Sequence, residues 1–308
     1  MKLGLHTDSV GHRPFSEMLD IAAEAGVEGL ELPAGGQSQA PHLRLDELLA
    51  DELARARLLE EIRARGLEIC ALNCSAWPLH PVFGADSEEL IERTFTLAEL
   101  LEVETVVTMS GTPGDAPGDS TFTWPWYPWP PDQVALLERQ WEQALELWAS
   151  LVEKAQAHGV RRLAFELHPL HLVYNVPTLE RLREALGPMI GANVDPSHLL
   201  WQRMDSAAVV RELGGAVHHV HLKDTRYDPG QLGLAGVLDS RPFADPARRA
   251  WTFCTLGRGH GVDFWAGFVA ALRDVGYDGA LAIEHEDPLA GDAEGVLEGA
   301  RFVRPLLA

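Results

Sequence analysis

Short apolar segments alternate along this chain with longer amphipathic segments, and this alternation restricts the possible folds more than any other feature. Phe15, Met18, Leu19 and Ala22 recur at helical spacing, and Gly26 follows them as a stop signal. Strands that alternate with helices indicate βα units around a parallel sheet. The predicted strands are residues 2–6, 29–32, 68–73, 105–109, 163–167, 190–194, 217–222 and 280–283.

Eight strands that are each followed by a helix close naturally into a single (β/α)8 TIM barrel. The length of 308 residues suits one such barrel with loop insertions. An open doubly wound sheet is the alternative, but no glycine-rich phosphate-binding motif follows the first predicted strand. Because the sequence has no internal repeat and no interdomain linker, we predict one domain over residues 1–308.

The helix boundaries carry their own signals. A long helix is predicted around residues 134–152, ending near Gly159. Asp205 and Asp263 are predicted N-caps of helices that begin at Ser206 and Phe264.

Two connections are much longer than the others, residues 111–133 after the fourth predicted strand and residues 225–261 after the seventh. Segments that follow the strands of such a barrel lie over its C-terminal face, where active sites are built, and long loops in compact domains are usually functional. The first loop is rich in Pro and Trp. These aromatic side chains could fill the core, form a surface patch or line a substrate site, and we favour a wall that includes Trp126 and Trp129.

The charge balance restricts the expected partners, and the cysteines and the N-terminus indicate the compartment. The chain has 25 Lys and Arg against 46 Asp and Glu, a net charge of −21, which repels nucleic acid and anionic membranes. The three cysteines include no CxxC pair, the N-terminus lacks a signal peptide, and no apolar run reaches the ~20 residues of a membrane span. We therefore expect a cytoplasmic protein without nucleic-acid or membrane partners.

Four potential metal ligands follow or close predicted strands in the second half of the chain. They are Glu166, Asp195, His221 and Glu284. Any one of these acids alone is better explained as a helix cap or as the partner of an arginine. Four such residues at the same end of parallel strands favour a shared site, and three carboxylates with one imidazole suit Mn²⁺, Mg²⁺ or Co²⁺.

Further polar residues stand close to these four in the sequence. His168 points to the same side of an extended chain as Glu166, which suits proton transfer or substrate binding, or a supporting contact that orients a ligand. His198 and Lys223 follow Asp195 and His221 at short distances and are predicted substrate-binding residues.

Three other residues are candidates of lower rank. His219 is predicted to face the barrel interior in a structural role. Arg258 and His260 lie in the glycine-rich stretch LGRGHG, whose tight turn could return either side chain to the substrate site.

The motifs FELHP, NVDPSHLLW, HVHLKDT and GHGVDFW resemble those of the sugar phosphate isomerase/epimerase proteins in the xylose isomerase-like barrel superfamily. NCSAWPLHP and the closing GYDGALAIEHED are similar to segments of the same proteins. The resemblance implies an ion, Mn²⁺ most often, held by Glu166, Asp195, His221 and Glu284. It also implies that the two glutamates transfer the substrate proton and that His198 lies near the substrate.

The superfamily also includes endonuclease IV, which uses three zinc ions and additional histidines. Ser75 and Ser110 occupy those positions here, so DNA repair is not expected. Relatives with an FELHP-like turn resemble enzymes that act on 3-keto-sugars and their glycosides.

The first hypothesis is therefore a metal-dependent isomerase or epimerase of a ketose or keto-sugar. Glu166, Glu284 or His168 would remove the proton next to a carbonyl and form an enediolate. The alternative is a lyase or deglycosidase that eliminates the aglycone of a 3-keto-glycoside, and a third possibility is a barrel that binds sugar without catalysis. A homo-oligomer or a small partner subunit is compatible with each of them.

Overall fold

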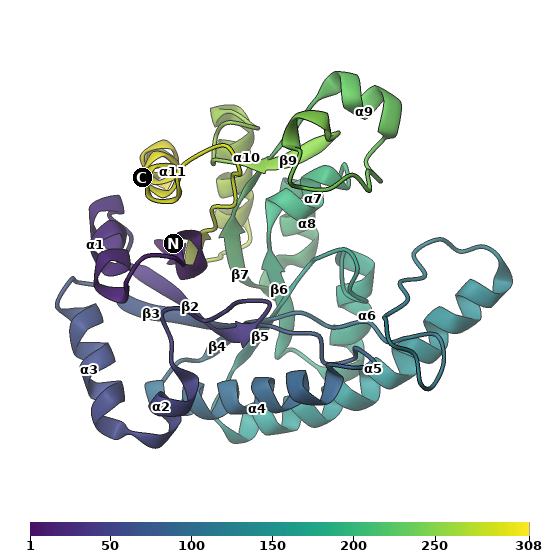
Figure 1. Ribbon diagram of the computed structural model, residues 1–308, viewed down its shortest axis with the longest axis horizontal. Helices are drawn as coiled ribbons and strands as arrows, with labels where there is room; N and C mark the ends of the chain where they lie inside the picture. Colours follow the sequence, from purple (N-terminus) through teal and green to yellow (C-terminus); the bar gives the residue numbers. More distant parts are fainter. Residues whose placement is uncertain (308) are drawn as a thin grey trace. The chain divides into compact units, whose positions relative to one another are not determined.

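The computed structural model describes residues 1–307 and contains all eight predicted strands, joined by helices (Figure 1). The strands hydrogen-bond in the order β1-β10-β7-β6-β5-β4-β3-β2 and close into a barrel. Their bounds are β1 Lys2–His6, β2 Gly29–Gly36, β3 Glu68–Ser75, β4 Thr105–Thr108, β5 Arg162–Glu166, β6 Ile190–Val194, β7 Val217–Leu222 and β10 Ala280–Ile283. The predicted (β/α)8 barrel is confirmed.

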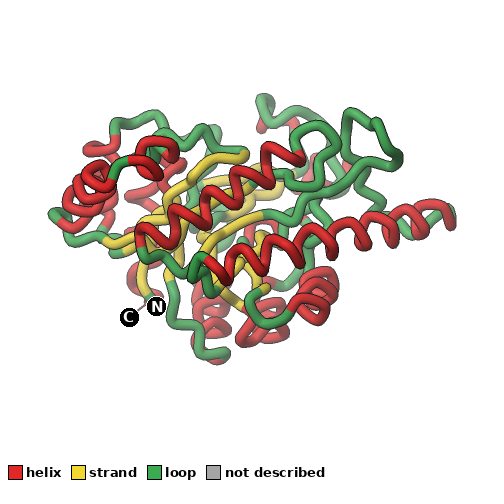
Figure 2. Tube along the Cα trace, turned by 90° about the horizontal axis from the view of Figure 1, so that it is seen from below, coloured by secondary structure: helices red, strands yellow, loops and turns green. Residues whose placement is uncertain are grey.

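Helices follow the strands along the chain; in Figure 2 the helices are red and the strands yellow. Helix α1 stops because Gly26 adopts a left-handed φ of 66°, a conformation that glycine tolerates. The helices are α1 Phe15–Ala25, α2 Leu45–Ala50, α3 Glu52–Arg63, α4 Gly84–Leu101, α5 Pro131–Ala157, α6 Val176–Leu186, α7 Pro196–Trp201, α8 Ser206–Leu213, α9 Pro229–Ala235, α10 Val262–Asp274 and α11 Asp292–Leu307. In residues 1–307 no helix is long and apolar enough to cross a membrane.

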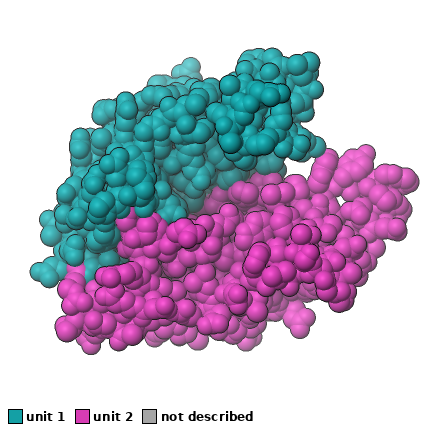
Figure 3. All heavy atoms as spheres, in the orientation of Figure 1, with its two compact units in different colours: residues 1–31, 58–70, 194–308 teal, residues 32–57, 71–193 magenta. Residues whose placement is uncertain are grey.

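The chain divides into two compact units, coloured separately in Figure 3. The first unit contains residues 1–31 and 58–70 and continues from Val194 to the end of the described chain. The second contains residues 32–57 and 71–193. The expectation of one domain over residues 1–308 remains a prediction.

Core packing in the second unit holds β4 and β5 against the long helix α5. The indole of Trp148 on α5 is fully buried, and its ring meets Phe165 edge-on at 4.5 Å. Its Nε1 donates to the carbonyl oxygen of Ser110 at 3.0 Å, so the polar atom of this buried side chain is satisfied. Ala71, Val107 and Ala164, on the neighbouring strands β3, β4 and β5, form a buried apolar cluster.

Both long connections follow the predicted strands. Residues 109–130 contain no helix or strand, although Trp124 Nε1 ties this loop to the carbonyl oxygen of His171 at 3.0 Å. The second connection contains α9 and an antiparallel hairpin of β8 (Asp224–Tyr227) and β9 (Trp251–Cys254), which the sequence analysis did not predict.

One predicted cap is correct and one is wrong. The carboxylate of Asp205 accepts from the backbone N–H groups of Ala207 and Ala208, as predicted. Asp263, in contrast, lies in the first turn of α10, whose N-cap is Gly261. A carboxylate in the first turn still favours the helix because it faces the positive end of the helix dipole.

Candidate metal centre

Three of the four predicted ligands lie together in the first unit. Asp195 directly follows β6, His221 lies in β7, and Glu284 directly follows β10. Strands β7 and β10 are neighbours, and the backbone N–H of Glu284 donates to the carbonyl oxygen of Leu222 at 3.2 Å. The potential ligand atoms of Asp195, His221 and Glu284 lie within 4.8 Å of one another. Side chains at the ends of parallel strands therefore converge as the sequence pattern predicted.

The fourth predicted ligand, Glu166, closes β5 in the second unit. Its side chain is buried, and in the sheet it pairs in register with Asn193. Asn193 stands two residues before Asp195 in the chain. In an extended segment, residues two apart point to the same face, so Asn193 and Asp195 share a direction at the end of β6.

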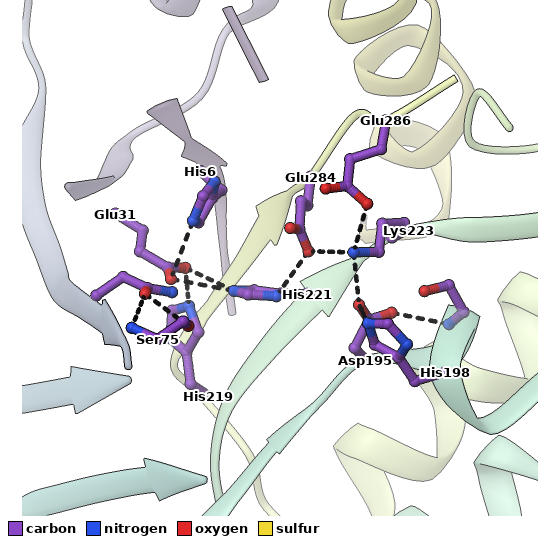
Figure 4. A network of polar contacts seen from close by, with 12 residues as sticks. His6, Glu31, Ser75, Asp195, His198, His219, His221, Lys223, Glu284 and Glu286 are labelled. Carbon is purple, nitrogen blue, oxygen red and sulfur yellow. Dashed lines mark hydrogen bonds and ion pairs between the residues drawn. The ribbon is translucent and has the colours of Figure 1, made fainter. Parts of the chain in front are cut away.

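His221 stands between two carboxylates (Figure 4). Its Nδ1 lies 2.9 Å from Oε2 of Glu284, and its Nε2 lies 2.9 Å from Oε2 of Glu31. Burial alone would lower the pKa of His221, but the charges of Glu31 and Glu284 outweigh burial and raise it well above the usual value. The imidazole is therefore held as a cation between two anions.

Lys223 supplies a second buried positive charge. Its Nζ lies 3.3 Å from Oδ2 of Asp195 and 3.0 Å from both Oε2 of Glu284 and Oε2 of Glu286. The ammonium group also lies 4.7 Å above the ring of Phe253. Burial would raise the pKa of Glu284, but Lys223 and His221 hold it well below the usual value. The ammonium group of Lys223 therefore lies among three carboxylates.

This donor set suits a divalent metal ion. Carboxylate oxygens and one imidazole nitrogen are typical ligands of Mn²⁺, Mg²⁺ and related ions. Asp195 is already oriented, because its Oδ1 accepts from the backbone N–H of Ser197 at 2.8 Å and caps α7. In addition, the carboxylates of Asp195 and Glu284 already share a cation, which is the ammonium group of Lys223.

His198 adds a neutral imidazole to this group. Its Nε2 lies 3.4 Å from Oδ2 of Asp195. Burial lowers the pKa of His198 to about 4, because the opposing charge of Asp195 offsets burial only in part and Lys223 adds to the lowering. A neutral imidazole can donate with one nitrogen and accept with the other.

Sequence reasoning missed the residue on the far side of His221. Glu31 in β2 is fully buried, and its carboxylate accepts from Nε2 of His219 at 2.7 Å as well as from His221. Nε2 of His6 lies 3.8 Å from the same carboxylate. Glu31, His219 and His221 form a second group whose potential ligand atoms lie within 4.8 Å of one another. The available signal was an acid inside the otherwise apolar segment GLELPAGG, since a buried acid needs partners.

The loop LGRGHG is hydrogen-bonded to Asp224, the residue that follows Lys223 in the chain. Oδ2 of Asp224 accepts from the backbone N–H groups of Gly257, Gly259 and His260 at 3.1, 3.0 and 2.9 Å. Its Oδ1 faces Nδ1 of His260 at 2.8 Å. Arg258 points elsewhere, because its guanidinium pairs with Glu298 of α11 at 2.6 Å.

The remaining predicted residues lie in the second unit. Nδ1 of His168 donates to the carbonyl oxygen of Pro169, and the ring meets His171 edge-on at 5.5 Å. Trp126 and Trp129 are 49% and 65% exposed, so neither is a core residue. The alternative of core packing for these two side chains is thereby removed.

Residues 19–306 match the family described as xylose isomerase-like TIM barrel. The chain belongs to the xylose isomerase-like TIM barrel family. The expected membership of the xylose isomerase-like barrel superfamily is confirmed.

One relative in this family is the uncharacterized protein YfiH from Bacillus subtilis strain 168. It is 43% identical to this chain over 300 residues, which cover 96% of each chain. The IOLI protein with a zinc atom superposes with a TM-score of 0.69 at 16% identity, covering 100% of this chain and 98% of the other. L-ribulose 3-epimerase superposes with a TM-score of 0.65 at 16% identity, covering 99% of this chain and 94% of the other. At such identities the two structures support the fold of this xylose isomerase-like barrel and nothing finer.

Proposed function

We propose that this protein is a divalent-metal-dependent isomerase or epimerase of a ketose or keto-sugar. The observation that carries the proposal is the convergence of Asp195, His221 and Glu284 within 4.8 Å, with hard donor atoms. Glu166, at the buried end of β5, would be the fourth ligand. The donor set favours Mn²⁺, with Mg²⁺ or Co²⁺ as substitutes.

When bound, such an ion would act as a Lewis acid that polarises a carbonyl of the sugar. The protein side chains would carry out the proton transfer. Glu284 or Glu166 would accept the proton from the carbon next to the carbonyl and return it to the other carbon or to the opposite face. His168 is a further candidate for this transfer, because Nδ1 donates to a carbonyl oxygen and Nε2 is then the basic nitrogen of the neutral ring.

Binding of the sugar would depend on neutral and cationic groups around the carboxylates. His198, which stays neutral at pH 7, would exchange hydrogen bonds with a substrate hydroxyl. The ammonium of Lys223 would hold an oxygen on which negative charge develops. The exposed rings of Trp126 and Trp129 would stack on the C–H face of the sugar, and His260 would contact its polar edge. Arg258, which the sequence placed in the same role, pairs with Glu298 instead and is left out of this proposal.

Exchange of a carbon-bound proton tests this proposal. The Mn²⁺-loaded protein is incubated in D₂O with free ketoses and, separately, with 3-keto-glycosides. Deuterium that enters the substrate at the carbon next to the carbonyl, detected by NMR together with an isomer or epimer, supports the proposal. Release of an aglycone instead supports the eliminating alternative. Binding of sugars without any exchange or elimination, equal in the presence and absence of metal, would identify a binding protein.

A further inference from the structure

We propose that Glu31 is a positioning residue, which fixes the ring of His221 so that Nδ1 faces the metal and Nε2 keeps its proton. The inference rests on the proposed metal site and adds a residue that is not among its four ligands. It explains why a carboxylate is buried on β2, on the opposite side of the imidazole from Glu284.

The geometry of His221 is the first support. Its two nitrogens face two different carboxylates, with Nδ1 2.9 Å from Glu284 and Nε2 2.9 and 3.1 Å from the two oxygens of Glu31 (Figure 4). An ionised carboxylate only accepts hydrogen bonds, so the nitrogen that faces Glu31 has to carry the proton. The same holds for Nδ1, which faces Glu284, as long as no metal ion is bound. A metal ion held by Asp195 and Glu284 would displace the proton of Nδ1, while Nε2 would keep its hydrogen bond to Glu31.

The contact between Glu31 and a second histidine is the second support. Nε2 of His219 lies 2.7 Å from Oε2 of Glu31, and the side chain of Glu31 is completely buried. His219 and His221 are two residues apart in β7 and therefore point to the same face of the strand. One carboxylate thus contacts both imidazoles.

This contact passes through the barrel interior rather than along the sheet. In the closed strand order, β10 and β1 lie between β7 and β2, so Glu31 does not neighbour the histidines through backbone pairing. The contact between Glu31 and the two histidines is therefore made by the side chains alone, across the interior of the barrel. Metal-binding histidines are commonly oriented through such a carboxylate on their second nitrogen.

A competing interpretation of the same residues is a second metal site formed by Glu31, His219 and His221. Occupation of both sites would require His221 to give a lone pair from each nitrogen, and hence to lose both ring protons. The hydrogen-bonded arrangement requires the loss of only one. The number of metal ions bound per chain separates the two interpretations.

The test uses Co²⁺ as the probe, because its visible absorption reports the geometry and identity of its ligands. Full-length protein is titrated with Co²⁺, its affinity is measured by competition with a chelator, and bound metal is counted by elemental analysis. We expect one ion per chain in the unsubstituted protein. In Glu31→Gln, which keeps the shape and removes the charge, we expect affinity to fall about 10- to 100-fold and the Co²⁺ spectrum to change.

Two further substitutions separate orientation from charge and from folding. Glu31→Asp keeps the charge but withdraws the oxygens from the rings, so it should be impaired as well if orientation matters. His219→Gln removes the second imidazole that holds Glu31, and should change the spectrum even if Glu31→Gln folds poorly. Glu298→Gln, which removes a carboxylate that pairs with Arg258 in another contact, is the matched control and should leave affinity and spectrum unchanged.

The outcomes distinguish this inference from the proposed function. If the unsubstituted protein takes up no Co²⁺, the metal site fails and the inference fails with it. If it binds Co²⁺ while Glu31→Gln binds with equal affinity and an identical spectrum, the inference alone is overturned. Two ions per chain, of which Glu31→Gln loses one, would overturn it in favour of the second metal site.

Discussion

Nζ of Lys223 lies 3.0 Å from Oε2 of Glu284, so an ammonium group already stands among the carboxylates proposed to hold a metal ion. Two cations that share the same carboxylates compete for them. In Lys223→Met the metal would meet no such competitor, and we expect its affinity to rise about tenfold, equal to ~1.4 kcal/mol. Isothermal titration with Mn²⁺ checks this. Unchanged binding would show that the ammonium does not compete with the metal, and weaker binding would show that it supports the metal site.

Loss of one carboxylate of the proposed ligand set should have the opposite effect. In Glu284→Gln we expect Mn²⁺ affinity to fall by about 100-fold or more and turnover to be lost, because the amide oxygen carries no charge. Elemental analysis after gel filtration measures metal retention. Glu286→Gln is the control, since Glu286 contacts Lys223 but lies outside the ligand set, and this variant should keep its metal. A fully active Glu284→Gln would remove Glu284 from the set.

The two kinds of tryptophan in the second unit predict two different phenotypes. Trp148 is fully buried, so Trp148→Ala should lower the free energy of unfolding by about 3–5 kcal/mol. Trp129 is 65% exposed, so Trp129→Ala should change stability by no more than about 0.5 kcal/mol. If Trp129 belongs to the substrate wall, its variant should raise KM with little change in kcat. Urea denaturation and steady-state kinetics measure the two effects, and an unchanged KM would remove Trp129 from the wall.

Acid should weaken the contact between the N-terminal region and α11. The hydrogen bonds from Arg13, at 2.8 and 2.9 Å, hold the pKa of Asp292 at about 2, below its usual value of 3.8. A depressed carboxyl pKa stabilises the fold above about pH 4, and this stabilisation is lost as the pH falls towards 2. Solvent screening reduces it to roughly 1 kcal/mol. Urea denaturation of Asp292→Asn and the unsubstituted protein should differ at pH 6 and converge near pH 2; a constant difference would contradict the assignment.

The strands and the ends of the strands could be predicted because their signals are local. Glu284 follows the apolar run ALAI, and Asp195 follows IGANV, so each acid marks the point where a buried strand stops. Parallel strands in a barrel then bring such residues to one end. The order of the segments and the period of their apolar residues are sufficient to predict this convergence.

The contacts that depend on non-adjacent strands could not be predicted in this way. Glu31 stands inside an apolar strand, and its partners His219 and His221 are 188 and 190 residues away in the sequence. The β8–β9 pair was missed because its two short strands are separated by the long connection that contains α9. The spacing of apolar residues in the sequence does not predict which side chains are in contact across the interior of a barrel.

The attachment of the LGRGHG loop to Asp224 limits how this region can vary in evolution. A Cβ atom at Gly259 would lie 2.4 Å from the carbonyl oxygen of Thr225, so any larger residue there would push the loop off its acceptor. Asp224 is bonded to Lys223 in the backbone, and that displacement would reach the ammonium at the centre of the carboxylates. Substitution of the His260 side chain therefore leaves the backbone hydrogen bonds of this loop in place, whereas substitution of the glycine before it would break them.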